Sequence, residues 1–189
     1  MPLRIRIAGY TKTKDLFENV AGGDCEQHTA VSYYHDGENL VFVFDCVEAS
    51  PVVFGDKDND KLYKGDVVEV MITLGRPERY LEVSVNPARL KYAAIVDNPD
   101  RDGSGITVTP IEENPVETEV LPTEAGYAAR ITIPIAWLKE IGWSADCSLI
   151  NFYRQDFNDA GDLRLYALSP TRSASFHKPD AFVPMEILM

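Results

Sequence analysis

Short segments of alternating apolar and polar residues, separated by turn residues, run along most of the chain, and this alternation restricts the fold more than any other feature. Residues 40–46 are rich in β-branched and aromatic side chains and follow a turn cluster at residues 35–39, a combination typical of a β-hairpin. Similar segments recur every ~8 to 15 residues, as in antiparallel sandwiches. The expected strands are residues 29–34, 40–46, 66–73, 80–86, 91–96, 107–111, 118–121, 127–133, 149–154, 163–168 and 185–188.

Helix signals are scarce. Pro134 opens one segment and Gly142 lies just past its end, which is the punctuation of a helix of one or two turns. Residues 15–20 could form one further helical turn. Neither a repeat nor a linker divides the chain. The sequence therefore predicts an all-β fold: a single antiparallel β-sandwich domain over residues 1–189, with jelly-roll-like connections and one short helix.

The chain is acidic. It has 18 Lys and Arg residues against 30 Asp and Glu residues, which gives a formal net charge of −12. Such a surface cannot replace the counterions around nucleic-acid phosphates, and an anionic membrane repels it, so we expect neither partner. Neutral ligands, cationic ligands and metal ions remain compatible with this charge. No apolar run approaches the ~18 residues that a membrane-spanning helix needs.

The three cysteines are Cys25, Cys46 and Cys147. Their odd number and wide spacing argue against a disulfide framework, and the lack of a C-x-x-C pair argues against a zinc ribbon. The first residues show no long apolar core followed by a small-residue cleavage site, so no signal peptide is visible. A cytoplasmic protein and a secreted protein whose leader has been removed both fit this start.

Motifs for catalysis are missing from the sequence. There is no phosphate-binding glycine loop and no G-x-S-x-G turn, and His28, His35 and His177 show no ligand spacing. A glycosidase needs two carboxylates about 5 to 10 Å apart across the scissile bond. Glu69 with Glu82 is a geometrically possible pair, although many sandwich faces carry two carboxylates by chance. The sequence predicts a binding protein rather than an enzyme.

Alternation gives the strands at residues 66–73 and 80–86 one apolar and one polar face. If residues 73 and 80 flank the hairpin turn, Glu69 lies across from Ser84. A plain solvated outer face is the alternative interpretation. In this register the polar side also carries Glu82 and Asn86, diagonally across from Glu69. The apolar side carries Val68, Val70, Ile72, Leu81, Val83 and Val85.

Acidic loops indicate metal binding. Asp56, Asp58 and Asp60 alternate like the oxygen ligands that open a calcium loop. Lys61 and Val67 stand where an EF-hand has Gly and Glu, so that motif is excluded. One structural calcium held by Asp56, Asp58 and Asp60 is the first expectation, and solvated turns are the alternative. Residues 97–103 and 158–162 are similar clusters.

Six segments form an ordered set of motifs. They are residues 35–44 (HDGENLVFVF), 63–72 (YKGDVVEVMI), 80–86 (YLEVSVN), 129–134 (ARITIP) with the later Gly142 and Trp143, 151–154 (NFYR) and 175–182 (SFHKPDAF). In order and spacing they resemble the family 9 carbohydrate-binding modules and their stand-alone relatives, a branch of the DOMON-like β-sandwiches. The resemblance covers residues 28–188.

The resemblance implies a sugar site. In binding members of that family two aromatic rings enclose a terminal sugar, a carboxylate, an amide and an arginine reach its hydroxyls, and bound calcium supports the loops. By position, Tyr63 and Phe176 match the rings and Glu69 matches the carboxylate. Glu82 and Ser84 stand near the family's arginine and asparagine, so those contacts are not reproduced. The ligand-binding candidates are Tyr63, Glu69, Glu82, Ser84, Asn86, Arg154 and Phe176.

This chemistry is plausible in itself, because the C–H face of a pyranose stacks on an aromatic ring and its hydroxyls donate to a carboxylate. The sequence predicts non-catalytic recognition of a carbohydrate, as a mono-, oligo- or polysaccharide end, by a module attached to or acting beside a glycoside hydrolase. The second interpretation is a structural or protein-interaction domain of the same fold that has lost sugar binding, its rings capping the sandwich edge. The third is a haem-carrying DOMON-type domain, which needs axial His or Met ligands, and Met71 is the candidate in mid-strand. Calcium is the one cofactor expected.

Overall fold

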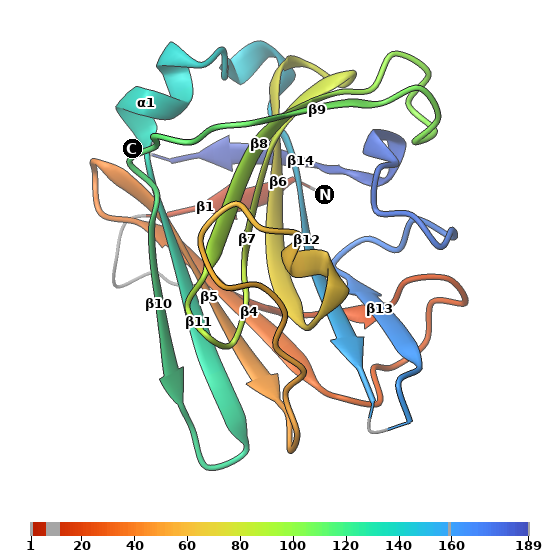
Figure 1. Cartoon of the computed structure of the whole chain (residues 1–189). Coiled ribbons are helices and arrows are strands. Elements are labelled where there is room, and N and C mark those ends of the chain that lie inside the picture. The colour runs from red at the N-terminus through yellow and green to blue at the C-terminus, as the bar shows by residue number, and fades with distance from the viewer. Residues whose placement is uncertain (1, 7–11, 159, 189) are drawn as a thin grey trace.

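Two sheets pack face to face in the computed structural model, which describes residues 2–6, 12–158 and 160–188 (Figure 1). Counted over these residues, the larger sheet has nine strands and the smaller one has five. The larger sheet has the spatial order β1 (Leu3–Ile5), β14 (Val183–Ile187), β12 (Leu149–Phe157), β6 (Val67–Arg76), β7 (Arg79–Val85), β8 (Lys91–Asp97) and β9 (Thr107–Pro110), with β13 (Leu163–Ala167) beside β12 and β3 (Phe17–Glu18) beside β13. The smaller sheet has the order β10 (Glu117–Pro122), β11 (Gly126–Pro134), β5 (Asn39–Val47), β4 (Thr29–His35) and β2 (Lys12–Asp15).

Helices are short, as the sequence predicts. The helix α1 (Ile135–Glu140) follows Pro134 directly, and Gly142 takes a φ of +115°, which residues with a Cβ rarely adopt. The 3-10 segments are η1 (Leu62–Lys64), η2 (Ala145–Cys147) and η3 (Pro179–Ala181). No helix in the described ranges combines the length and the apolar character needed to cross a membrane. The prediction of an all-β sandwich with one short helix is confirmed.

The N-terminal segment differs from the prediction. Residues 15–20 form no helical turn, because Phe17–Glu18 pairs as β3 with β13 and a turn follows it. Strands β1 and β2 are also unpredicted, and β1 lies parallel to β14 at the far end of the chain. Such short strands form only because their backbones hydrogen-bond to the edge of a sheet built from residues far away in the sequence. No local sequence pattern therefore predicts them. Met1 and residues 7–10 of the start considered for a signal peptide lie outside the described residues, as does Asp159 of the acidic cluster at 158–162.

The core between the sheets follows the predicted alternation. Val68, Val70 and Ile72 of β6 are fully buried on the inner face. From the smaller sheet, Phe42 packs against Phe152 of β12 with ring centroids 5.3 Å apart. Burying such side chains contributes about 1.5–3 kcal/mol each, which makes this layer the main source of stability.

A second apolar cluster covers part of the outer face of the larger sheet. Met71, Tyr80 and Tyr153 point outward from their strands, and Phe176 and Phe182 of the segment before β14 pack onto them. Tyr80 also bonds through its hydroxyl to Nδ1 of His177 at 2.8 Å. Tyr153 of this cluster is the cross-strand partner of Glu69, so the polar part of the same face borders an apolar wall.

Candidate functional site

The β6–β7 hairpin has the predicted register. Thr73 pairs with Tyr80 and Glu69 pairs with Ser84. On the next strand Tyr92 pairs with Ser84, and on the other side of β6 Tyr153 pairs with Glu69. Since side chains of paired residues leave a sheet on the same side, Glu69 lies at the centre of a row that crosses four strands.

Several polar side chains on or beside this row have no partner among the described residues. Glu69 is 5% exposed and Ser84 is 3% exposed. Asn151 and Tyr153 on the same face bond to each other. By contrast, in the described residues no hydrogen bond or ion pair reaches the side chains of Glu69, Glu82, Ser84, Tyr92 and Tyr63, which we call the polar face. Glu69 and Ser84 are the buried members of this set, and because buried polar groups are normally paired, their unpaired side chains indicate a ligand.

Electrostatics set the protonation of the polar face. Burial, and then the nearby charge of Glu82, raise the pKa of Glu69 well above its usual value. Burial raises the pKa of Glu82 to about 7. Burial, followed by the charges of Glu82 and Glu69, raises the pKa of Tyr92 to about 12. Near neutral pH the carboxyl pair therefore holds a proton, and the polar face offers both donors and acceptors.

Tyr63 is 56% exposed and lies close enough to Tyr92 to contribute to the raised pKa of that residue. Gln155 of β12 holds the segment η1 in place, since its side-chain amide donates to the carbonyl oxygens of Tyr63 and Gly65. Gly65 is required there, because a Cβ would lie 2.6 Å from the carbonyl oxygen of Val52. The η1 backbone is thus held in place, and the Tyr63 side chain that it carries is exposed to solvent.

Phe176 occupies a different environment from the one expected. Its ring is 9% exposed and stacks on Tyr153 with centroids 4.2 Å apart. It belongs to the second apolar cluster, whose packing buries it. The expected pair of open rings is therefore reduced to Tyr63, and Phe176 forms part of the wall.

Two further candidates have structural partners instead of free groups. Arg154 is fully buried and pairs with Val68, so it points into the sandwich, on the opposite face from Glu69. Asn86 is also fully buried, and its amide donates to the Phe54 carbonyl oxygen at 3.0 Å while its oxygen accepts from a backbone amide of the following turn. Arg154 and Asn86 are thus engaged within the protein, because alternation buries one and the turn engages the other.

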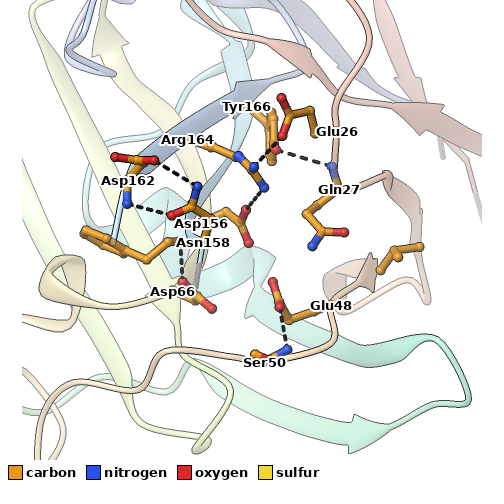
Figure 2. A network of polar contacts seen from close by, with 12 residues as sticks. Glu26, Gln27, Glu48, Ser50, Asp66, Asp156, Asn158, Asp162, Arg164 and Tyr166 are labelled. Carbon is orange, nitrogen blue, oxygen red and sulfur yellow. Dashed lines mark hydrogen bonds and ion pairs between the residues drawn. The ribbon is translucent and has the colours of Figure 1, made fainter. Parts of the chain in front are cut away.

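The Arg154 guanidinium instead serves a buried carboxylate cluster, shown in Figure 2 and made up of Glu48, Asp66 and Asp156. One oxygen from each carboxylate lies within 4.8 Å of the others. Arg154 donates to Glu48 and to Asp156, both at 2.7 Å. Arg164 lies 3.8 Å from Oδ2 of Asp156, which accepts no hydrogen bond. Burial, and then the Glu48 carboxyl, raise the pKa of Asp156 to about 7.

The acidic loop predicted to hold calcium has other roles. Oδ2 of Asp60 accepts the backbone amide of Asp56 at 2.8 Å, and Oδ1 of Asp58 accepts that of Lys91 at 2.9 Å. These carboxylates stabilise the turn and do not converge. Within the described residues the group that does converge is the buried carboxylate cluster, in which Arg154 donates to two of the three carboxylates and one oxygen of Asp156 accepts no hydrogen bond.

Sequence reasoning missed Tyr92 and the buried carboxylate cluster. Tyr92 could have been found by extending the alternation argument to the strand at residues 91–96. The cluster gives a weaker signal, because Glu48, Asp66 and Asp156 come from three separate parts of the chain. One local sequence feature does indicate the cluster: Arg154 and Asp156 lie two residues apart, and so on the same side of a buried strand.

Comparison with known proteins bears on the fold. The sequence matches no protein-family profile. A solved structure of a proposed carbohydrate-binding protein from Bacteroides uniformis superposes with a TM-score of 0.78 at 13% identity, over 99% of both chains. A family 9 carbohydrate-binding module from Caldicellulosiruptor kristjanssonii, solved with cellotriose, gives a TM-score of 0.63 at 11% identity over 98% of this chain and 93% of that one. The chain has the fold of the family 9 carbohydrate-binding modules.

The family 9 fold extends over nearly the whole chain. A family 9 module from the same organism, solved with glucose, also gives a TM-score of 0.63, over 98% of this chain and 96% of that chain. An extracellular protein of Arthroderma benhamiae is 26% identical over 164 residues, which are 79% of this chain and 73% of that protein. The resemblance seen in the sequence motifs is thus matched by the backbone.

Proposed function

We propose that this chain recognises carbohydrate without catalysis, on the polar face. The observation that carries the proposal is the set of unpaired groups around Glu69, which is almost completely buried yet bonds to nothing within the described residues. Sugar hydroxyls supply both donors and acceptors, and a carboxylate forms strong charge-assisted bonds with them. The open ring of Tyr63 beside these groups suits the C–H face of a pyranose.

The fold supports the same function. Two of the solved structures with this fold are modules bound to cellotriose and to glucose. The acidic charge of −12 also favours a neutral or cationic ligand over nucleic acid or an anionic membrane.

A binding role suits the two carboxylates better than a catalytic one. A glycosidase places its carboxyl groups on either side of the bond that it cuts. Glu69 and Glu82 lie on the same face of one sheet as diagonal neighbours, because Glu69 pairs with Ser84 and Glu82 pairs with Met71. Both therefore approach a ligand from the same side, as groups that read hydroxyls do.

A glycan array followed by calorimetry tests this function. The wild type should bind at least one sugar, and Tyr63→Ala and Glu69→Gln should both weaken that binding while leaving the fold intact. Leu121→Ala is a matched control, because Leu121 is 51% exposed on β10 of the other sheet. A wild type that binds no sugar on the array would contradict the proposal and favour the structural or protein-interaction domain.

Calcium belongs to the proposal as a structural ion. Family 9 resemblance implies it, and Glu48, Asp66 and Asp156 would hold it. Oxygen ligands of this kind are those that calcium prefers. Bound there, the ion would supply positive charge that fixes the ends of β5, β6 and β12, and it would stand apart from the polar face.

A further inference from the structure

Glu69 and Glu82 are neighbours on the polar face and lack a cationic partner among the described residues. In the β6–β7 ladder Glu69 faces Ser84 and Glu82 faces Met71, so the two carboxylates are diagonal neighbours. Such positions lie about 7–8 Å apart in an antiparallel pair, within reach of long side chains. One small ligand group can therefore contact both carboxylates at once.

Three basic side chains close in sequence to the two carboxylates are engaged elsewhere. Lys64 lies over the ring of Phe54, with Nζ 5.0 Å from the centroid. Lys91 donates to a backbone carbonyl oxygen at 2.6 Å. Arg79 pairs with a carboxylate of β8 at 2.5 Å. In the described part of the chain, no ion pair compensates the negative charge of the polar face.

This arrangement is costly in the free protein. A carboxylate removed from water is stable only when it is paired or protonated. Burial raises the pKa of both groups accordingly. A ligand that brings its own positive charge would replace the proton and form charge-assisted hydrogen bonds with both oxygens.

We propose that the sugar bound on the polar face carries a cationic amino group, as glucosamine and its β-1,4-linked oligomers do, and that its ammonium lies between Glu69 and Glu82. This rests on the proposed function, since it specifies the class of sugar. Tyr63 then stacks on the ring of the amino sugar, and Ser84 contacts a neighbouring hydroxyl. The net charge of −12 draws a cationic oligosaccharide toward the protein.

A metal ion suits the polar face less well. Glu69 and Glu82 supply two carboxylates, whereas the group of three that converges within 4.8 Å is the buried carboxylate cluster. Tyr63, which is 56% exposed, also provides stacking area that a metal does not use. Both observations favour an organic cation.

Three oligosaccharides of equal length test the proposal by calorimetry. A glucosamine oligomer, its N-acetylated form and a cello-oligosaccharide share one skeleton and differ at C2 in an ammonium, an amide or a hydroxyl. The wild type should bind the glucosamine oligomer at least about tenfold more tightly than either neutral compound, because charge-assisted bonds are roughly twice as strong as neutral ones. Glu82→Gln should remove most of this preference.

Glu124→Gln is the control for general attraction. Glu124 is an exposed carboxylate in the β10–β11 loop, and Glu124→Gln removes one formal negative charge far from the polar face. Equal losses in Glu82→Gln and Glu124→Gln would overturn the proposal, as would neutral oligomers that bind as tightly as the cationic one. The proposal would also be overturned if calcium ions bound at Glu82 and the glucosamine oligomer did not bind. Tight binding of a neutral sugar alone would leave the proposed function standing, whereas an array without any bound sugar would remove both.

Discussion

Phe176 stacks on Tyr153 with ring centroids 4.2 Å apart and planes 22° apart, so a residue expected to hold a ligand instead completes the second apolar cluster. Phe176→Ala should therefore destabilise the fold by about 3–5 kcal/mol, the usual cost of removing a buried phenylalanine. Tyr63→Ala should change stability by less than about 0.5 kcal/mol, because its ring is exposed. Urea unfolding of both variants measures this, and equal losses would contradict the assignment of the two rings.

Arg154 neutralises the buried carboxylate cluster. Arg154→Leu should cost about 3–5 kcal/mol of unfolding free energy, because it leaves buried Glu48 and Asp156 without their cation. Arg130→Leu is the control, since its ion pair with Glu119 spans 3.6 Å between half-exposed side chains, and it should change stability by less than about 0.5 kcal/mol. A small effect of Arg154→Leu in the same urea series would show that the cluster needs no cation.

Calcium should raise the melting temperature by binding the folded state at the buried carboxylate cluster. The increase between chelator and excess calcium should disappear in Asp156→Asn, which removes the unbonded Oδ2. It should persist in Asp58→Asn, whose carboxylate accepts a turn amide. Identical wild-type melting curves in calcium and chelator would exclude the site.

Glu82 makes stability depend on pH in a definite direction. Its pKa rises from about 4.5 to about 7 on folding because of burial, so between these values the folded state binds more protons than the unfolded state. Stability from this group therefore falls as pH rises from 4.5 to 7 and is constant above. Glu82→Gln, which keeps the uncharged form, should raise the melting temperature at pH 8 and have little effect at pH 4. If the difference in melting temperature between Glu82→Gln and the wild type does not grow from pH 4.5 to pH 7, Glu82 is well solvated in the folded protein.

The strands were predictable because alternation is local. The register of Glu69 and Ser84 followed from two strands and the turn between them, all within 20 residues of sequence. The buried carboxylate cluster was not predictable in this way, since the bond between Arg154 and Glu48 joins residues 106 positions apart. Phe176 changed role for a similar reason. Whether a ring faces solvent or packs onto a sheet depends on how its loop folds over that sheet, and alternation says nothing about loops.

The most direct test of carbohydrate recognition on the polar face is an amide NMR titration with the sugar that binds best. The largest shift changes should fall in η1 and in β6, β7 and β8, around Tyr63, Glu69 and Tyr92. A rival location exists beside α1, where Pro134, Lys139 and Trp143 line a pocket of about 660 Å³. Changes centred on that pocket, or spread over the smaller sheet while β6 and β7 remain unchanged, would contradict the proposed site.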